Sequence, residues 1–376
     1  MSVGALGVWP TLPPVAYLRR PRRQAPFPLG QPSCVLYSRA RQGLVHGVRA
    51  LGIAPGEILV PAYHHGAEVE AFELAGASCR FYAGTADLAP DEAELEAALS
   101  PRTRALHLIH NLGFPQDAAH WAAWCRRHGL LLIEDGAPAW LSTVDGAAAG
   151  SFGDLSVFSL YKTVGVPDGA AAICTAPLPA PRPGGALRLA ATAKRHLAWL
   201  GQRVPAVARA AEVARRDHPF DHRHAFEPGD LAAGPSLAAR LLLPRLLDPR
   251  IVERRRANYE YLLAAVGAHV PPPFDRLAEG AVPWVFPVVT KRKPGVLASL
   301  AADRVSAMDL WSVPHRSLAV ERFPAAAERR ASTVALPVHQ GLRLEDLERI
   351  AAAALRALGD ETTEVSPNVR PASWSS

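Results

Sequence analysis

Short apolar runs alternate with stretches of helical hydrophobic spacing through the first half of the chain. The runs that predict strands lie at 57–61, 79–83, 105–110, 130–135, 155–161 and 170–176. The stretches that predict helices lie at 41–51, 67–75, 91–99 and 118–128. Nearly continuous apolar strands that alternate with helices indicate a mainly parallel sheet covered on both faces. We therefore expect a three-layer αβα domain of the α/β class, whose ligands gather at the carboxyl ends of the strands.

The pattern changes after a Pro/Gly-rich segment at 177–185. Residues 186–216 are rich in Ala and Arg with helical spacing; such a helix can lie on a membrane, but packing on its own protein is the commoner role. A long helix is expected from about 236 to 266, interrupted at Pro244 and Pro249. Short strands and helices over 282–358 then indicate a smaller α/β domain. We divide the chain into an N-terminal arm (1–33), a large domain (34–235), and the long helix with a small C-terminal domain (236–376).

Composition excludes several classes of partner. The net charge is +6, but the arginines are scattered and no RNP, zinc-finger or basic-zipper pattern accompanies them, which argues against nucleic acid. The four cysteines lie far apart, as reduced thiols of a cytoplasmic protein do. No apolar run reaches the roughly 18 residues of a membrane span. The N-terminal segment places its apolar part before its basic part, the reverse of a signal peptide. We expect a cytoplasmic protein that binds neither nucleic acid nor membrane.

Two candidate chemical groups follow predicted strands at the same edge of the sheet. Asp135 ends one run and Lys162 follows another; only four of the 41 basic residues are lysines, and Lys162 is the first of them. A lysine can form a Schiff base with an aldehyde cofactor, and a carboxylate can keep a pyridine nitrogen protonated so that the ring accepts electrons. The start of the first predicted helix, SRARQG at 38–43, offers backbone N–H groups and guanidinium to a phosphate. Taken singly, a lysine beyond a strand is usually solvated and an aspartate there often caps a helix.

A series of short segments in order carries a resemblance to a known family. The segments are LGIAPGEILVP (51–61), LAGA (74–77), PRTRAL (101–106), HNLGFP (110–115), RHGLLLIEDGA (127–137), GSFGD (150–154), FSLYK (158–162) and ALPVHQGLRLEDLERI (335–350). Together they resemble the pyridoxal-phosphate-dependent sugar aminotransferases of fold type I, the DegT/DnrJ family, well over about 34–177 and loosely over 236–358. The resemblance implies the fold-type I transferase architecture, pyridoxal 5'-phosphate as cofactor, and a homodimer with shared active sites.

The resemblance also assigns roles. It implies that Lys162 is the Schiff-base lysine, that Asp135 is the partner of the pyridine nitrogen, and that Ser159 binds the cofactor phosphate. The other cofactor contacts that it implies are Ala40 and Arg41, at the Gly-Thr of the family's phosphate motif SGTAAL, and His65, where the family has an aromatic residue stacked on the ring.

The chain departs from the family at several of these positions. Arg41 exchanges a hydroxyl for a charged group, and Pro138 replaces the glutamine of the family's DAAQ. Lys162 follows Ser159 by only three residues, closer than in the family's FSFxPTKN. The NxRM loop, through which a neighbouring subunit reaches the site, has no clear match; a His-rich loop at 217–227 stands in its place. We still expect pyridoxal phosphate as the cofactor, but these departures argue against the usual nucleotide-sugar substrate.

Other interpretations can be compared with this one. Imidazoles at HxxxH spacing share a face only within a helix, and Pro219 argues against a helix, so we expect a polar or substrate-facing loop and no metal. Ser159 and Lys162 match the SxxK of penicillin-recognising hydrolases, but the SDN and KTG triplets are absent. A sugar dehydratase is less favoured, because the sugar dehydratases of the family lack the Schiff-base lysine that is present here as Lys162.

Two function classes remain. The first is an aminotransferase that moves an amino group from an amino acid, with glutamate expected, to a keto or aldehyde group of a sugar or related metabolite. The second is a non-catalytic relative that binds a ligand or partner on an eroded cofactor site. Retention of both Asp135 and Lys162 favours the enzyme.

Overall fold

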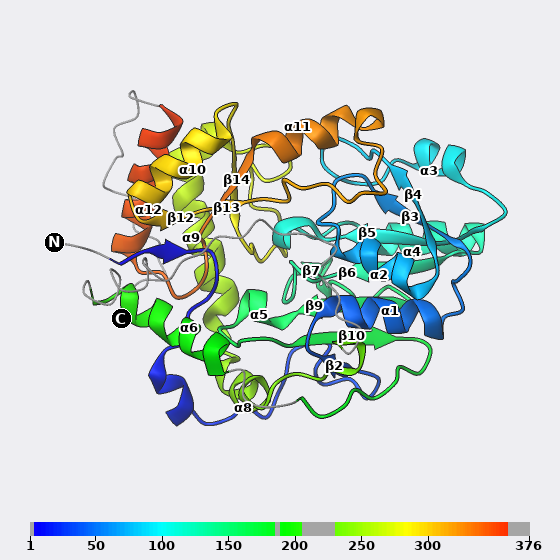
Figure 1. Ribbon diagram of the computed structural model, residues 1–376, viewed down its shortest axis with the longest axis horizontal. Helices are drawn as coiled ribbons and strands as arrows, with labels where there is room; N and C mark the ends of the chain where they lie inside the picture. The colour runs from blue at the N-terminus through cyan, green and yellow to red at the C-terminus, as the bar shows by residue number, and fades with distance from the viewer. Residues whose placement is uncertain (1–3, 185–188, 205–229, 360–376) are drawn as a thin grey trace.

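A seven-stranded sheet forms the centre of the large domain (Figure 1). The computed structural model describes residues 4–184, 189–204 and 230–359. The strand order is β2-β10-β9-β6-β5-β3-β4, and β10 alone runs against its neighbours, so the mainly parallel sheet is confirmed. The strands are β2 (Val35–Tyr37), β3 (Glu57–Pro61), β4 (Ser78–Tyr82), β5 (Thr103–Ile109), β6 (Leu131–Asp135), β9 (Leu155–Ser159) and β10 (Ala170–Cys174).

Helices cover both faces of this sheet because the strands are apolar on both sides. In β3, Ile58 and Val60 pack into the cluster under α1 (Ala40–Ala50) and α2 (Ala67–Ala75), whereas Leu59 packs with Trp124 of α4 (Ala118–His128) on the other face. The three-layer αβα architecture is therefore confirmed. The other helix in this region is α3 (Glu92–Ala98), and a small hairpin is formed by β7 (Thr143–Val144) and β8 (Ala147–Ala148).

Two expectations about local structure are wrong. The run at 155–161 is not one strand: β9 ends at Ser159 and a short helix, α5 (Leu160–Thr163), begins at once. Pro244 does not interrupt a helix but lies inside α8 (Leu237–Leu246), near its end, where the missing N–H costs a single helical hydrogen bond. The expected break falls instead at Pro249, which precedes α9 (Arg250–Val266).

A smaller unit follows α9, next to the sheet (Figure 1). Its three-stranded sheet has the order β11-β14-β13 and packs against α9 and α12 in one hydrophobic cluster. The elements are β11 (Phe286–Val289), α10 (Lys293–Ala302), β12 (Val305–Ser306), β13 (Met308–Asp309), α11 (Pro324–Ser332), β14 (Thr333–Leu336) and α12 (Leu344–Leu358). The domain boundaries inferred from the sequence stay a prediction.

Residues 4–18, here called the strap, join the two units. The strand β1 (Leu6–Gly7) pairs in parallel with β12 of the small unit, and the 3-10 helix η1 (Pro14–Leu18) packs on α8. Between them the strap contacts α6 (Leu189–Gly201), where the His196 ring bonds the Leu12 carbonyl at 2.8 Å. Gly165 allows this close approach, because a Cβ there would lie 2.3 Å from the Thr11 carbonyl oxygen.

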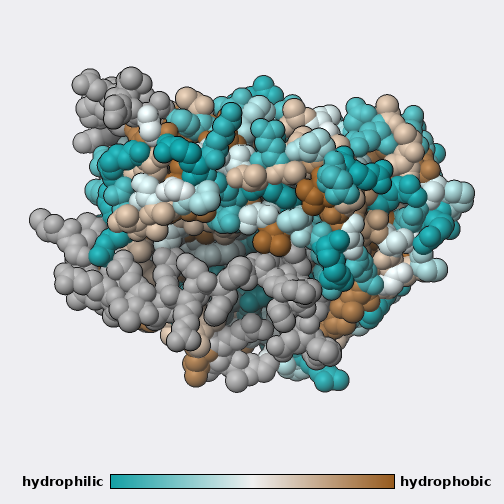
Figure 2. All heavy atoms as spheres, turned by 45° about the horizontal axis from the view of Figure 1, so that its top comes forward, coloured by the Kyte–Doolittle hydropathy of each residue, from teal (hydrophilic) through white to brown (hydrophobic). Residues whose placement is uncertain are grey.

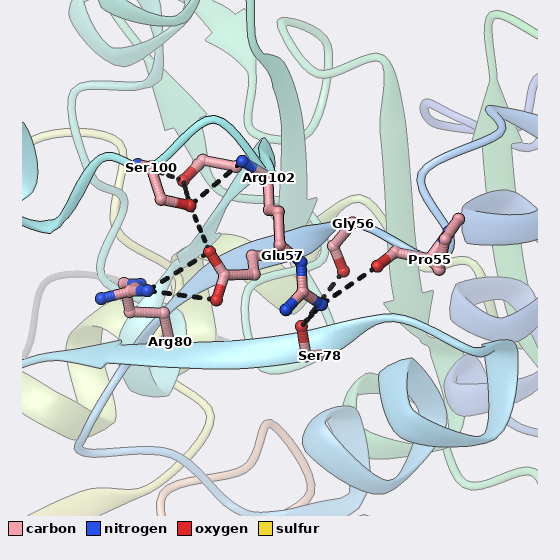
Figure 3. Close-up of polar contacts among 8 residues, drawn as sticks. Pro55, Gly56, Glu57, Ser78, Arg80, Ser100 and Arg102 are labelled. Carbon is pink, nitrogen blue, oxygen red and sulfur yellow. Dashed lines mark hydrogen bonds and ion pairs between the residues drawn. The ribbon is translucent and has the colours of Figure 1, made fainter.

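Polar groups at the amino-terminal edge of the sheet form hydrogen bonds with one another (Figure 3). The Glu57 carboxylate accepts hydrogen bonds from Ser100 (2.5 Å) and Arg80 (3.2 Å), while Arg102 donates to the Pro55 carbonyl and to Ser78. These bonds fix the starts of β3 and β4 and leave the opposite edge for ligands. Figure 2 shows a mostly hydrophilic face with scattered hydrophobic residues, and no helix in the described ranges is long and apolar enough to cross a membrane.

Candidate active site

A cavity of about 930 Å³ lies at the carboxyl ends of the strands, between the large sheet and the small unit. Six residues assigned from the sequence line it: Ala40, Arg41, His65, Asp135, Ser159 and Lys162. The structure thus brings together residues that are up to 122 positions apart in the sequence. Their individual roles toward a cofactor stay predictions.

The two acidic residues at the end of β6 point into different surroundings. Glu134 is fully buried, and its carboxylate accepts hydrogen bonds from the His110 ring (2.9 Å), the Gly150 N–H (2.9 Å) and the Phe152 N–H (2.7 Å). Asp135 lines the cavity, as the alternation of side chains along a strand requires. Glu134 therefore holds the structure together, whereas Asp135 is available to a ligand.

The Asp135 carboxylate is held in its ionised form. One oxygen accepts the Ala137 N–H at 2.8 Å, and the other lies 3.8 Å from Nε2 of His107, which is fully buried. Burial raises the pKa of Asp135, but the His107 ring and the Lys162 ammonium outweigh it and hold this pKa below its ordinary value. A buried, ionised carboxylate is the group that can keep a proton on a pyridine nitrogen.

Lys162 lies in α5, just beyond the strand that neighbours β6. Its Nζ is 4.1 Å from the centre of the Trp284 ring, in cation–π geometry. Arg255, which is only 1 % exposed, donates hydrogen bonds to the carbonyls of Lys162 (3.1 Å) and Thr163 (3.2 Å). The backbone of α5 is thereby fixed from α9, so the amine has a defined position over the cavity.

Cations collect at the start of α1. Ala40 and Arg41 form its first turn, where backbone N–H groups point outward without helical partners. Arg39, which precedes the helix, lies 4.8 Å above the Tyr161 ring. Although burial raises the pKa of Tyr161, the charges of Lys162 and Arg39 outweigh it and lower this pKa below its usual range. Such a corner is chemically suited to a phosphate.

His65 stands in the turn between β3 and α2. The Glu68 carboxylate accepts the N–H groups of His65 (2.8 Å) and Gly66 (3.1 Å), which fixes this turn at the start of α2. The imidazole lies edge-on to Trp311 with ring centres 6.4 Å apart. A ring at this position can face a planar cofactor across the cavity.

Several lining or supporting residues escaped the sequence analysis. His107 had a local signal, because it is the polar residue within the apolar run at 105–109, and Tyr161 lies inside the FSLYK segment. Trp9, Trp284 and Arg255 had none, since only the fold brings the two tryptophans to the cavity and Arg255 to the backbone of Lys162. The His-rich loop at 217–227 lies outside the described residues.

One group of side chains has metal-binding geometry. Glu70, Glu73 and His315 each offer a ligand atom within 4.8 Å of the others. Arg316 already pairs with Glu70 at 2.7 Å and with Glu73 at 3.0 Å, so the negative charge is neutralised without an ion. We assign no metal to this group.

Comparison with known proteins agrees with this geometry. The sequence model of the DegT/DnrJ/EryC1/StrS aminotransferase family matches residues 27–174. The chain is 28 % identical over 338 residues to UDP-N-acetyl-3-dehydro-alpha-D-glucosamine 3-aminotransferase of Acidithiobacillus ferrooxidans, covering 84 % of this chain and 81 % of that one. It is 27 % identical to GDP-perosamine synthase of Caulobacter vibrioides, covering 81 % and 80 %.

Solved structures agree in fold. The aminotransferase TlmJ from Streptoalloteichus hindustanus superposes with a TM-score of 0.62 at 24 % identity, over 87 % of this chain and 86 % of that one. DesV of S. venezuelae superposes with a TM-score of 0.63 at 23 % identity, over 88 % and 85 %. The fold and the enzyme class expected from the sequence are thus confirmed, and so is the resemblance to the DegT/DnrJ/EryC1/StrS aminotransferase family, whose model matches residues 27–174.

Proposed function

We propose that this protein is a pyridoxal-phosphate-dependent aminotransferase that transfers an amino group from an amino acid, glutamate first among the candidates, to a keto or aldehyde carbon of a sugar or related metabolite. One observation carries the proposal: an ionised carboxylate, Asp135, and an amine, Lys162, line one cavity beside a cationic helix start. A relative that matches most of the chain is named as a 3-aminotransferase of a UDP-linked dehydro sugar, which supports a sugar acceptor.

The side chains and backbone groups that line the cavity fit pyridoxal phosphate. When bound, pyridoxal phosphate supplies an aldehyde that takes up amino groups and a ring that accepts the electrons of a broken C–H bond. Asp135 would hold the proton on the ring nitrogen, backed by His107. The N–H groups at the start of α1, with Arg41 and Ser159, would bind the phosphate, and His65 would lie against the ring.

Lys162 has two tasks in this scheme. Its Nζ would anchor the cofactor between turnovers. Once released by the incoming amine, it would take the proton from the donor carbon that bears the amino group and, in the second half-reaction, give a proton to the acceptor carbon. The Trp284 face, 4.1 Å away, shields this nitrogen from water on one side. Arg255 donates a hydrogen bond to the backbone carbonyl of Lys162, so the side chain that carries the amine moves while its backbone stays in place.

We further propose a cytoplasmic homodimer with active sites shared between subunits. Apolar side chains are exposed on three neighbouring elements of the described chain: Tyr17 and Leu18 on η1, Leu197 on α6, and Leu237 and Leu241 on α8. A second copy would bury this surface. All four cysteines are free thiols, which supports a reducing compartment. Light scattering on purified protein tests the dimer, and a monomer would contradict it.

The function is tested by spectroscopy of the purified protein. Added pyridoxal phosphate should give a visible absorbance band, and glutamate should bleach it while 2-oxoglutarate appears in equal amount. A panel of keto sugars, free and nucleotide-linked, should then restore the band, and the compound that does so identifies the acceptor. A protein that stays colourless would refute the proposal. A stable band that no amine bleaches would favour the non-catalytic alternative.

A further inference from the structure

Two arginines beside the cavity have no carboxylate partner among the residues that the structure describes. Arg39 lines the cavity, and its guanidinium donates to the Ser38 carbonyl at 3.3 Å. Arg195, on α6, donates to the Pro10 carbonyl at 2.9 Å. Neither forms an ion pair with any residue in the described ranges, although most other buried charges of the site are paired or accept several hydrogen bonds.

Both guanidinium groups lie against a pair of aromatic rings. Arg39 is 4.8 Å from the centre of the Tyr161 ring, the Tyr161 and Trp9 rings are tilted with centres 5.8 Å apart, and Arg195 is 5.5 Å from the centre of the Trp9 ring. Trp9 belongs to the strap and also lies 5.8 Å from Trp284, beside Lys162. Trp9 is 38 % exposed and lines the cavity, so a ligand can reach it.

The cofactor does not account for this charge. Its phosphate would be matched by the first turn of α1 with Arg41 and Ser159, and its ring nitrogen by Asp135. Arg39 and Arg195 are additional: burial and, to a smaller extent, repulsion from Arg39 lower the pKa of Arg195 to about 10, although Tyr161 acts to raise it. Uncompensated positive charge at a partly buried site costs free energy unless a ligand supplies the anion.

We propose that Arg39 and Trp9 form a second anion subsite, distinct from the phosphate site of the cofactor, which binds a carboxylate or phosphate group of a substrate. This inference rests on the proposed function. Arg39 would contact the oxyanion through its planar fork, and the Trp9 indole would pack against the attached carbon framework. Arg195, behind Trp9, is a positioning residue. An amino-acid donor carries a carboxylate and a nucleotide-linked acceptor carries phosphates, so either substrate offers the required chemistry.

Unreactive anions test the subsite in the cofactor-loaded enzyme. Glutarate imitates the donor without its amino group, and inorganic pyrophosphate imitates the acceptor phosphates. Titration calorimetry should show that one of them binds to the wild type and that Arg39→Gln weakens it by about 10- to 100-fold, the range for a lost charge-assisted hydrogen bond. Arg39→Lys should recover part of the affinity, and Trp9→Leu should weaken it. Arg276→Gln, an exposed arginine away from the cavity, is the matched control and should bind as the wild type does.

The outcomes distinguish a donor carboxylate from an acceptor phosphate, and a failure of the subsite from a failure of the proposed function. A glutarate effect with a raised KM for the amino donor identifies the donor carboxylate, and a pyrophosphate effect identifies the acceptor. The subsite is refuted if neither anion binds the wild type, or if Arg39→Gln leaves binding within about twofold. It is also refuted if Arg39→Gln weakens cofactor uptake alone, because Arg39 then serves the cofactor phosphate. A wild type that takes up no pyridoxal phosphate refutes the proposed function instead.

Discussion

Replacing each of the adjacent carboxylates of β6, Glu134 and Asp135, by its amide should affect different properties of the protein. Glu134→Gln should lower stability and spare the chemistry of the molecules that stay folded. Asp135→Asn should spare stability and suppress amino transfer. The contrast follows from their surroundings, since Glu134 accepts three hydrogen bonds in the interior and Asp135 faces the cavity.

The magnitudes follow from the hydrogen bonds. One Glu134 oxygen accepts from His110 and Gly150 and the other from Phe152, so an amide must turn its NH₂ group toward at least one donor. Loss of one charge-assisted bond costs about 1.5–3 kcal/mol in stability. Asp135→Asn can still accept the Ala137 N–H and should cost under about 1 kcal/mol. Its missing charge removes about 4 kcal/mol of attraction to a protonated ring nitrogen, or roughly 10³ in rate.

Two measurements check this pair of variants. Circular dichroism melts at saturating pyridoxal phosphate report stability, with cofactor concentration held equal because ligand binding itself raises Tm. Stopped-flow absorbance after mixing with glutamate reports the first half-reaction per loaded site. The reasoning is refuted if Glu134→Gln melts like the wild type yet loses the half-reaction, or if Asp135→Asn stays within about tenfold of the wild-type rate.

Three further outcomes are expected. Lys162→Ala should abolish the visible band of lysine-linked pyridoxal phosphate while the melt stays cooperative; a persisting band would move the anchor to another amine. Burial, followed by the charge of Arg255, lowers the pKa of His339 to about 3, so as pH falls below the ordinary value near 6.5 the unfolded chain takes the proton first and stability is lost. His339→Gln should therefore remove about 1.4 kcal/mol of the stability difference between about pH 7.5 and about pH 5.5 in urea unfolding, and an unchanged difference would contradict the assignment. Gly165→Ala should destabilise the fold by about 1–3 kcal/mol, because its Cβ would press on the strap at Thr11; a neutral effect in thermal unfolding would show that the strap can move away.

Local pattern was sufficient for much of the fold and the predicted site. The strand β3 and the helices α2 and α4 have the predicted bounds, because their apolar spacing and their ends are set by neighbouring residues. Asp135 could be placed at the edge where ligands gather because it ends a predicted strand of a parallel sheet, whose carboxyl ends meet at one edge.

Long-range packing decided the rest. Trp9 and Trp284 are 275 residues apart, yet their rings lie 5.8 Å from each other, and no periodicity relates them. The end of β9 at Ser159 was also hidden, because Leu160 and Tyr161 continue the apolar pattern although the chain has already turned into α5. Propensity did not exclude Pro244 from α8 because the helix is held by buried leucines at Leu242 and Leu246.

The pairing of the strap has a consequence for the order of assembly. Leu6 and Val305 are register partners across a closure of about 300 residues, and the entropy of such a closure must be overcome by contacts that form late. The strap cannot take its place before β12 has been synthesised, even though the large sheet ends at Cys174. The sheet can therefore fold during translation before Trp9 of the strap has reached the cavity. The cavity is therefore completed late, by strap residues that are synthesised before the sheet.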